Sequence, residues 1–223
     1  MSHSKSAKIR SQRYRDLQSE ITNLRQLLLP KKLSATGVYP NRVYTKVLSF
    51  RVLVHAEIEA FLEDRVRELC LDAMRKYKTS NKVTTTTAAL LAFSGLSFEQ
   101  PPDFVVSSDP GKQSKVDQKL SLEKKLEKAN LSFIYIIDNN HGLKEKNLLR
   151  LLLPVGFNPS AFDNVWLQSM NSFGNDRGMV AHTTRASYSA TALPDPRNEL
   201  NRIKDLLLGL HDIDTSLNRL LAE

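Results

Sequence analysis

The chain contains very little cysteine, glycine and proline. One cysteine, Cys70, among 223 residues excludes an internal disulfide framework and a cysteine-rich zinc site. The 8 glycines and 9 prolines are few for an all-β protein, which needs many turns. Leucine and lysine instead dominate long windows of the sequence. Together these features predict an all-α fold.

Long apolar runs are also absent. No stretch of 18 apolar residues exists, so we expect no membrane-spanning helix. The opening sequence "MSHSKSAKIR" has no apolar segment of the kind found in secretory signals. Hydrophobic residues nevertheless make up 41% of the chain, a value typical of proteins with a folded core. The sequence therefore predicts a folded, cytoplasmic protein.

The common short motifs for cofactors and metals are missing too. There is no G-x-x-x-x-G-K-[ST] phosphate loop, no dinucleotide fingerprint, no G-x-S-x-G nucleophile elbow and no H-E-x-x-H zinc motif. We therefore expect neither a cofactor nor a metal ion. The formal net charge, by contrast, is +8 and the pI is about 9.6. This balance favours a polyanionic partner, nucleic acid first, although a basic solvated surface has the same composition.

Apolar residues recur at helical spacing along most of the chain. They predict helices over residues 5–29, 41–77, 84–95, 116–133, 144–156 and 195–223. We interpret residues 96–116, with their paired prolines and a Ser-Asp-Pro-Gly turn, as an irregular inserted loop. Residues 134–142 fit either a short strand or a buried helix end. No repeat or second core is visible, so we predict one helical domain over 1–223.

A further helix is expected to begin at Asn158 and Pro159, which are typical of a cap and of a first helical position. This helix is predicted to end near Gly174. A new helix is then predicted to begin at Asn175 or Asp176, so the residues after them lie in its first turns.

The segment "NDRGMVAH" places Arg177 and His182 on this new helix, in an Arg-x4-His pattern. Free N–H groups at a helix N-terminus attract anions, and an arginine there binds phosphate oxygens in bidentate fashion. A histidine gives or takes a proton near neutral pH. Together they are the minimum for cleaving RNA without a metal. The alternative is coincidence, because this spacing occurs by chance in many helical proteins.

Polar residues elsewhere are candidates to support this pair. His55 and Glu59, four positions apart on the long predicted helix, share one face. Glu59 stands among apolar neighbours, so we expect it to have a partner, and Arg177 is the natural one. The alternative is a surface pair, or a buried pair that satisfies itself. Thr183 and Arg185 follow the motif directly and are expected to extend the contacts with RNA phosphates.

Three segments of the chain resemble the RiboL-PSP type of HEPN domain, a helical ribonuclease family. They are "VLSFRVLVHAEIEAFLEDRVREL", "NNHGLKEKNLLRLLLPVGFNPSAFDNVWLQSM" and "NDRGMVAHTT", and they occur in family order. The family motif is an arginine, a residue that is usually polar, a few spacers and a histidine. The resemblance implies an all-helical bundle, metal-independent RNA cleavage and a homodimer with the motif at its interface. It assigns the motif positions to Arg177 and His182.

One position departs from the family pattern. Gly178 follows the arginine where the family commonly has Asn, Asp or His; Asn175 and Asp176 are the candidates for that supporting role. The resemblance implies an endoribonuclease that leaves a 2′,3′-cyclic phosphate and acts as a toxin or as an effector in defence or stress. An inhibitory or antitoxin protein is then an expected partner. The alternative is a HEPN scaffold without catalytic activity that binds RNA or a protein.

Overall fold

The structure is a computed structural model that describes residues 10–96, 104–182 and 193–223. The side chains of Gln118, Leu120, Ala181 and His182 also lie outside the description. The described residues form helices and connections and no strand, so the predicted all-α fold is confirmed. None of the helices in these ranges combines the length and hydrophobicity that a membrane crossing requires.

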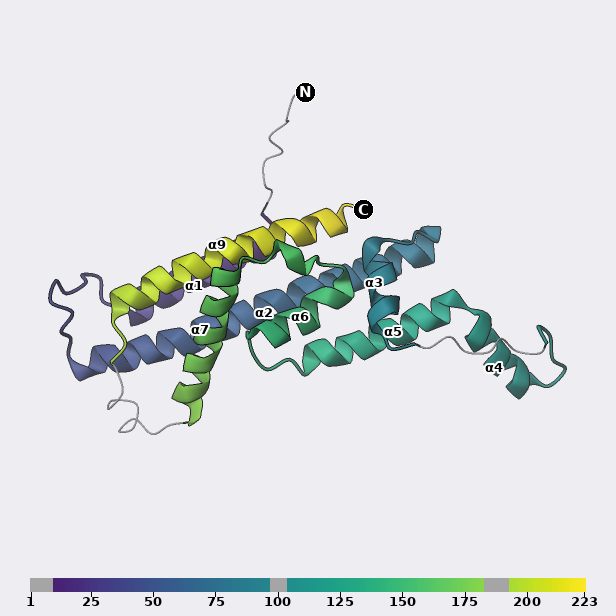
Figure 1. The fold of residues 1–223 in the computed structure, drawn as a ribbon, viewed down its shortest axis with the longest axis horizontal. Coiled ribbons are helices and arrows are strands. Elements are labelled where there is room, and N and C mark those ends of the chain that lie inside the picture. The colour runs from purple at the N-terminus through teal and green to yellow at the C-terminus, as the bar shows by residue number, and fades with distance from the viewer. Residues whose placement is uncertain (1–9, 97–103, 183–192) are drawn as a thin grey trace, which may run out of the picture.

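The 40-residue helix α2 (Asn41–Ser80) is the longest element, and two other helices lie along it (Figure 1). These are α1 (Gln12–Leu28) and α9 (Pro196–Leu221). The apolar stripe of α9 is buried at Ile203, Leu206, Leu210, Ile213 and Leu217. Burial of these side chains against α1 and α2 is the main favourable term that holds the three helices together.

The other elements lie on one side of α2, except that the helix Pro110–Leu120 lies at one end of the molecule and contacts the helix that follows it (Figure 1). In chain order they are α3 (Thr85–Phe93), α4 (Pro110–Leu120), α5 (Leu122–Asp138), α6 (Glu145–Leu152), the 3-10 turns η1 (Leu153–Val155) and η2 (Pro159–Ala161), and α7 (Asn164–His182). α7 crosses α2 and then the chain returns as α9. The buried apolar residues of α1, α2, α5, α6, α7 and α9 belong to one continuous cluster.

The predicted loop over 96–116 is too long, because α4 already begins at Pro110. The Asp109 carboxylate accepts a hydrogen bond from the backbone N–H of Gly111 at 2.8 Å and so caps this helix. The predicted helix over 116–133 is in turn divided at Ser121, whose hydroxyl accepts the Lys124 N–H at 3.2 Å and starts α5. Local capping therefore sets both helix starts, against a loop-like composition at Asp109 and against the apolar periodicity at Ser121.

α5 continues to Asp138, which decides the open choice at 134–142 in favour of a helix end. The start of α7 also differs from the prediction. Asn158 caps only the short turn η2, where its side chain accepts the Ser160 N–H at 3.0 Å. α7 begins at Asn164, and the Asp163 carboxylate accepts the Trp166 N–H at 2.8 Å.

The predicted helix break before the Arg-x4-His segment is wrong, because α7 runs without interruption from Asn164 to His182. Met170 and Phe173 are buried on its inner side. Gly174 lets the helix pass close to Lys144, since a Cβ at this position would lie 3.1 Å from Lys144 Cγ. This glycine therefore serves close packing inside a helix rather than ending one.

Charged contacts fix α7 and α9 on α2. Arg51 of α2 donates to both carboxylate oxygens of Glu199 in α9, at 2.9 and 2.6 Å, and both side chains are buried. Arg202 of α9 donates to Asp176 of α7 at 2.6 Å, and an Arg51 nitrogen lies 3.7 Å from the same Asp176 oxygen. Four charged groups from three helices thus set where α7 sits.

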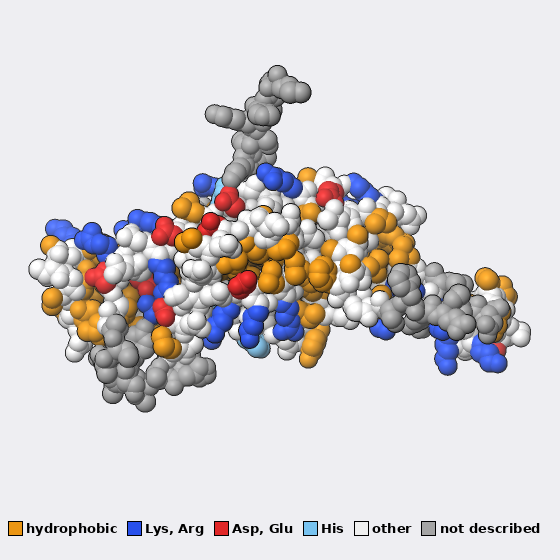
Figure 2. All heavy atoms as spheres, in the orientation of Figure 1, with side chains coloured by type: hydrophobic (Ala, Val, Ile, Leu, Met, Phe, Trp, Pro, Cys, Tyr) orange, Lys and Arg blue, Asp and Glu red, His pale blue; other side chains and the backbone are white. Residues whose placement is uncertain are grey.

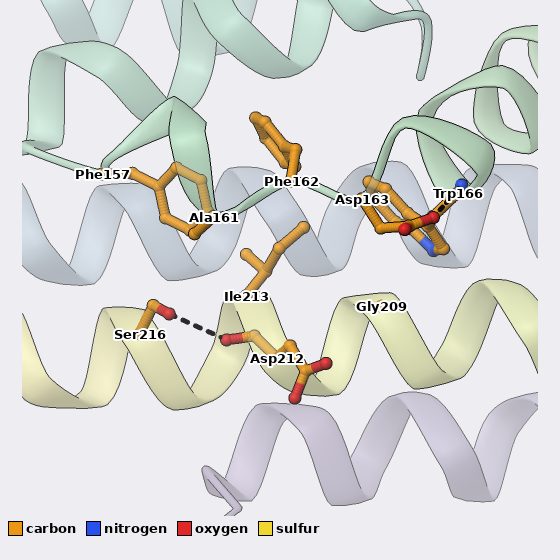
Figure 3. A pocket seen from close by; sticks show the side chains of 9 residues that line it. All are labelled: Phe157, Ala161, Phe162, Asp163, Trp166, Gly209, Asp212, Ile213 and Ser216. Carbon is orange, nitrogen blue, oxygen red and sulfur yellow. Dashed lines mark hydrogen bonds between the residues drawn. The ribbon is translucent and has the colours of Figure 1, made fainter.

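Figure 3 shows the place where η2 and the start of α7 meet α9. The Trp166 indole N–H donates to the backbone oxygen of Leu206 at 3.1 Å. A Cβ on Gly209 would overlap the Trp166 ring, so only glycine allows the two helices to approach this closely. A small cavity of about 90 Å³ remains beside Phe162 and Asp163.

Candidate functional site

A cavity of about 230 Å³ opens between α2, α6, α7 and the connection from α5 to α6. It is lined by His55, His141, Gly142, Leu143, Lys144, Lys146, Asn147, Gly174, Arg177 and Gly178. The motif arginine is among these residues, and two lysines and two histidines share the cavity with it. The arrangement brings a proton-titrating group and several cations to one place.

Arg177 reaches the cavity from the second half of α7, with Gly174 and Gly178 beside it. Because α7 does not begin at Asp176, no helix N-terminus lies here, and the predicted anion site of free backbone N–H groups is wrong. Side chains supply the positive charge instead. Basic side chains gather along the edge of the molecule where the α5–α6 connection runs (Figure 2).

His55 lies at the base of the site and is 2% exposed. Among the residues that the structure describes, none forms a hydrogen bond with its Nδ1 atom, which lies 3.6 Å from Glu59 Oε2. Burial, with a smaller contribution from the positive charge of Arg177, lowers the pKa of His55 to about 4. This imidazole is therefore neutral near neutral pH, and one of its two nitrogen atoms is enclosed without a hydrogen bond in the described part of the chain.

Glu59 stands one helical turn from His55 and is mostly buried. Burial raises the pKa of its carboxyl group, and this effect outweighs those of the Gly142 backbone, Arg177 and His141, which lower it. Arg177 thus lowers the pKa of both residues through its charge. Among the described residues no hydrogen bond or ion pair joins Glu59 to Arg177, so the expected pairing of these two residues stays a prediction.

We expect His55 to make the protein less stable in mild acid. The unfolded state takes up its proton near pH 6.5, whereas the folded state does so only near pH 4. The free energy of unfolding should fall across this window, by at most about 3 kcal/mol from this one group. His55→Gln removes the titration, so urea unfolding near neutral pH and near pH 4 should show a smaller loss in that variant. Equal losses of stability in both proteins would contradict the lowered pKa of His55. Glu59, whose raised pKa has the opposite effect on stability, is present in both proteins and so does not account for a difference between them.

An amide network holds the α5–α6 connection against α2. Asn140, which is 5% exposed, donates from Nδ2 to Glu63 Oε1 at 2.9 Å and to Glu59 Oε1 at 3.4 Å. Asn147 donates to Asn140 Oδ1 at 3.2 Å. Gly142 has a φ of 150°, a conformation that favours glycine, and allows the chain to turn there into the cavity wall. The network fixes one side of the cavity.

Asn175 and Asp176 do not line the cavity. The Asp176 carboxylate is engaged by Arg202 at 2.6 Å, so it ties α7 to α9. The Asn175 side chain is exposed on α7. Asp176 therefore influences the position of α7, and the predicted helix start at Asn175 or Asp176 is wrong.

His182 is the last residue of α7. On an α-helix, five residues correspond to a rotation of about 140° and an advance of about 7.5 Å from Arg177. The side chain of His182, and Thr183 and Arg185 altogether, lie outside the described residues. Their expected contacts with RNA stay predictions.

Sequence reasoning did not single out Lys144, Lys146, Asn140 or Asn147. All four belong to "NNHGLKEKN", a polar segment that lies between two stretches rich in apolar residues. The polar character of this segment was the signal in the sequence that could have marked it as part of a site. Only the fold shows that the α5–α6 connection and Arg177 line the same cavity. Among the residues that the structure describes, no group of three or more His, Cys, Asp or Glu side chains is placed to hold a metal ion.

The chain was compared with known proteins. The model of one family, described as RiboL-PSP-HEPN, matches residues 13–219. No curated protein and no solved structure matches the chain. The matched range extends from α1 to the last turn of α9 and contains the cavity and the Arg-x4-His segment. The chain therefore belongs to the RiboL-PSP-HEPN family.

Proposed function

We propose that this protein is a metal-independent endoribonuclease in which Arg177 and His182 act on the scissile phosphate. The observation that carries the proposal is the position of Arg177, which lines a basic cavity next to the buried His55. Membership of the HEPN family supports it, since many HEPN domains are ribonucleases. The net charge of +8 favours a polyanionic substrate.

The reaction needs only proton transfer and charge stabilisation. A base removes the proton of the 2′-hydroxyl group, and the 2′-oxygen attacks the adjacent phosphorus. The bond from phosphorus to the 5′-oxygen breaks, and that oxygen takes up a proton, which leaves a 2′,3′-cyclic phosphate and a 5′-hydroxyl end. His182 is the general acid or base, and the Arg177 guanidinium stabilises the extra negative charge on the phosphorane-like transition state.

A homodimer supplies both proton-transfer groups. Two copies of the motif at one interface provide one histidine as base and His182 of the partner subunit as acid. His55 lines the floor beside Arg177 with Glu59 next to it, and Asp176 holds α7 through Arg202. Thr183 and Arg185 contribute contacts with RNA phosphates, and Asn175 is a supporting polar residue beside the motif arginine. The setting is a toxin or an effector of defence or stress, restrained by an inhibitory or antitoxin protein.

The second candidate function is a HEPN domain that binds RNA or a protein without cleaving RNA. Gly178 favours it, because a Cβ at this position would meet no atom within 4 Å, so no packing constraint accounts for the missing polar residue. Arg177 and the lysines of the cavity serve either function by binding phosphate.

The test is cleavage of mixed cellular RNA in EDTA by the wild-type protein and by His182→Ala. We expect the wild type to produce fragments with 2′,3′-cyclic phosphate ends and the variant to be inactive. Binding of RNA by both proteins without cleavage supports the second candidate function. Equal cleavage by both would reject the assignment of His182 and indicate a contaminating nuclease.

A further inference from the structure

The cavity offers more positive charge than one phosphate requires. We propose that Lys144 and Lys146 bind a second phosphate of the RNA, adjacent to the scissile phosphate held by Arg177. The inference rests on the proposed function and specifies the substrate: an RNA strand that carries a phosphate next to the bond that is cut.

The first support is the charge balance of the cavity. Lys144 and Lys146 line it from the start of α6, and Arg177 lines it from α7. In the described part of the chain neither lysine forms an ion pair with a carboxylate, whereas Lys76 and Lys78 pair with Asp72 and Glu127, each at 2.7 Å. Lysines that line a cavity without an ion-paired carboxylate attract an anion. Here α6 and α7 place positive charge on two sides of the cavity.

The second support is His55, a buried group that lines the same cavity. Its Nδ1 atom is enclosed and has no hydrogen-bond partner among the described residues, which is costly for a polar atom. Burial and Arg177 keep the ring neutral, so one ring nitrogen carries a proton and can donate it to an acceptor. The enclosed Nδ1 atom lies 3.6 Å from Glu59 Oε2, so the positive charge that a phosphate meets in the cavity comes from Arg177 and the two lysines, and the neutral His55 beside them needs no counter-charge of its own.

The third support is the shape of the α7 wall. Gly174 and Gly178 are four residues apart and therefore share one face of the helix, and both line the cavity. A Cβ at Gly178 would meet nothing within 4 Å. Lys144 packs against this face at Gly174, whereas the face is open at Gly178 beside Arg177. A sugar-phosphate backbone can therefore lie against Gly178, with Arg177 and Lys144 lining the same cavity.

The test measures binding rather than cleavage, so that it is independent of the catalytic assignment. Full-length His182→Ala protein is titrated in EDTA with a fluorescently labelled eight-nucleotide RNA, and anisotropy is followed at several salt concentrations. Lys144→Gln/Lys146→Gln in the same background should weaken binding about tenfold and lower the magnitude of the salt slope by about 1 to 2, because one to two phosphate contacts are lost. Circular dichroism confirms that the variant is folded.

The matched control removes the same charge elsewhere. Lys112 and Lys115 are exposed on α4, at the end of the molecule remote from α7 (Figure 1). Lys112→Gln/Lys115→Gln should leave the affinity and the salt slope unchanged. If both double variants bind RNA equally well, or if the parent protein does not bind RNA, the proposal is overturned.

A competition experiment identifies the source of the second phosphate. Dinucleoside monophosphates with and without an added terminal phosphate compete with the labelled RNA. One phosphorylated form, 5′ or 3′, should compete about tenfold better than the unphosphorylated one, and this advantage should disappear in Lys144→Gln/Lys146→Gln. Inorganic phosphate that competes as well as the phosphorylated dinucleotide would show a site for a free anion and overturn the assignment to RNA. Cleavage by the wild type with no such advantage would reject this inference and leave the proposed function intact.

Discussion

Arg177→Ala should slow the cleavage of RNA in a single turnover by about 10² to 10³-fold, the usual cost of removing one group that stabilises transition-state charge. The guanidinium lines the cavity, and a neutral alanine offers nothing to a pentacoordinate phosphate. Arg177→Lys should recover only part of the rate, because an ammonium group binds phosphate as a point charge rather than in bidentate fashion. Rapid-quench cleavage of a labelled RNA with protein in excess measures the effect on the chemical step.

The same variant has a second readout that does not depend on catalysis. Since the charge of Arg177 lowers the pKa of His55, its removal should raise that pKa above about 4 in an NMR titration. Arg197→Ala, which removes an exposed arginine at the start of α9, should change neither quantity. A normal cleavage rate in Arg177→Ala would reject the assigned role of this residue in catalysis.

Arg51→Met should lower the free energy of unfolding by about 3 to 5 kcal/mol, because it leaves the buried carboxylate of Glu199 without its bidentate partner. Asp176 loses its more distant contact with Arg51 in the same variant but keeps Arg202. Urea unfolding near neutral pH measures the change. For a chain of this length, the corresponding drop in Tm is on the order of 10 °C.

Two controls separate this effect from a general loss of charge. Arg51→Met/Glu199→Leu removes both charges and should recover most of the stability, since an apolar pair of similar size replaces the ion pair. Arg13→Met breaks a pair with Asp64 that is 2.7 Å long but partly exposed, and it should cost no more than about 1 kcal/mol. If Arg51→Met costs no more than Arg13→Met, the buried pair does not stabilise the junction of α2 and α9.

Sequence patterns predicted the long elements well because each buries a continuous apolar stripe. α2 and α9 lie where the spacing of their leucines, valines and isoleucines placed them. Errors arose where one polar residue decides the local structure. Ser121 divides a helix that its apolar spacing continues, and Asp109 starts a helix within a stretch that composition marks as a loop. The expectation of one domain over 1–223 stays a prediction.

For the candidate site, the sequence indicated several of the residues but not which parts of the chain come together around them. Arg177, His55 and Glu59 were identified from residue type and spacing, and the fold brings them to one place. Gly174 was interpreted as a helix break because glycine ends many helices, yet here its missing Cβ admits Lys144. That contact joins positions far apart in the chain, and so does the approach of Lys146 to the cavity. Spacing along one helix carries no information about such tertiary neighbours.

The charged contacts between α2 and α9 also bear on when the protein acquires its site during synthesis. Arg51 emerges early in translation, but Glu199 lies 148 residues later, and Arg202, which holds Asp176 and thereby α7, lies later still. Contacts of such sequence separation form late, because a long intervening chain must be ordered first. A nascent chain that has produced α7 but not α9 therefore presents Arg177 on a helix that packs on α2 but is not yet tied down through Arg202. For the proposed ribonuclease, made on a ribosome that is itself composed largely of RNA, this order of events delays assembly of the proposed cleavage site until α9 has been made.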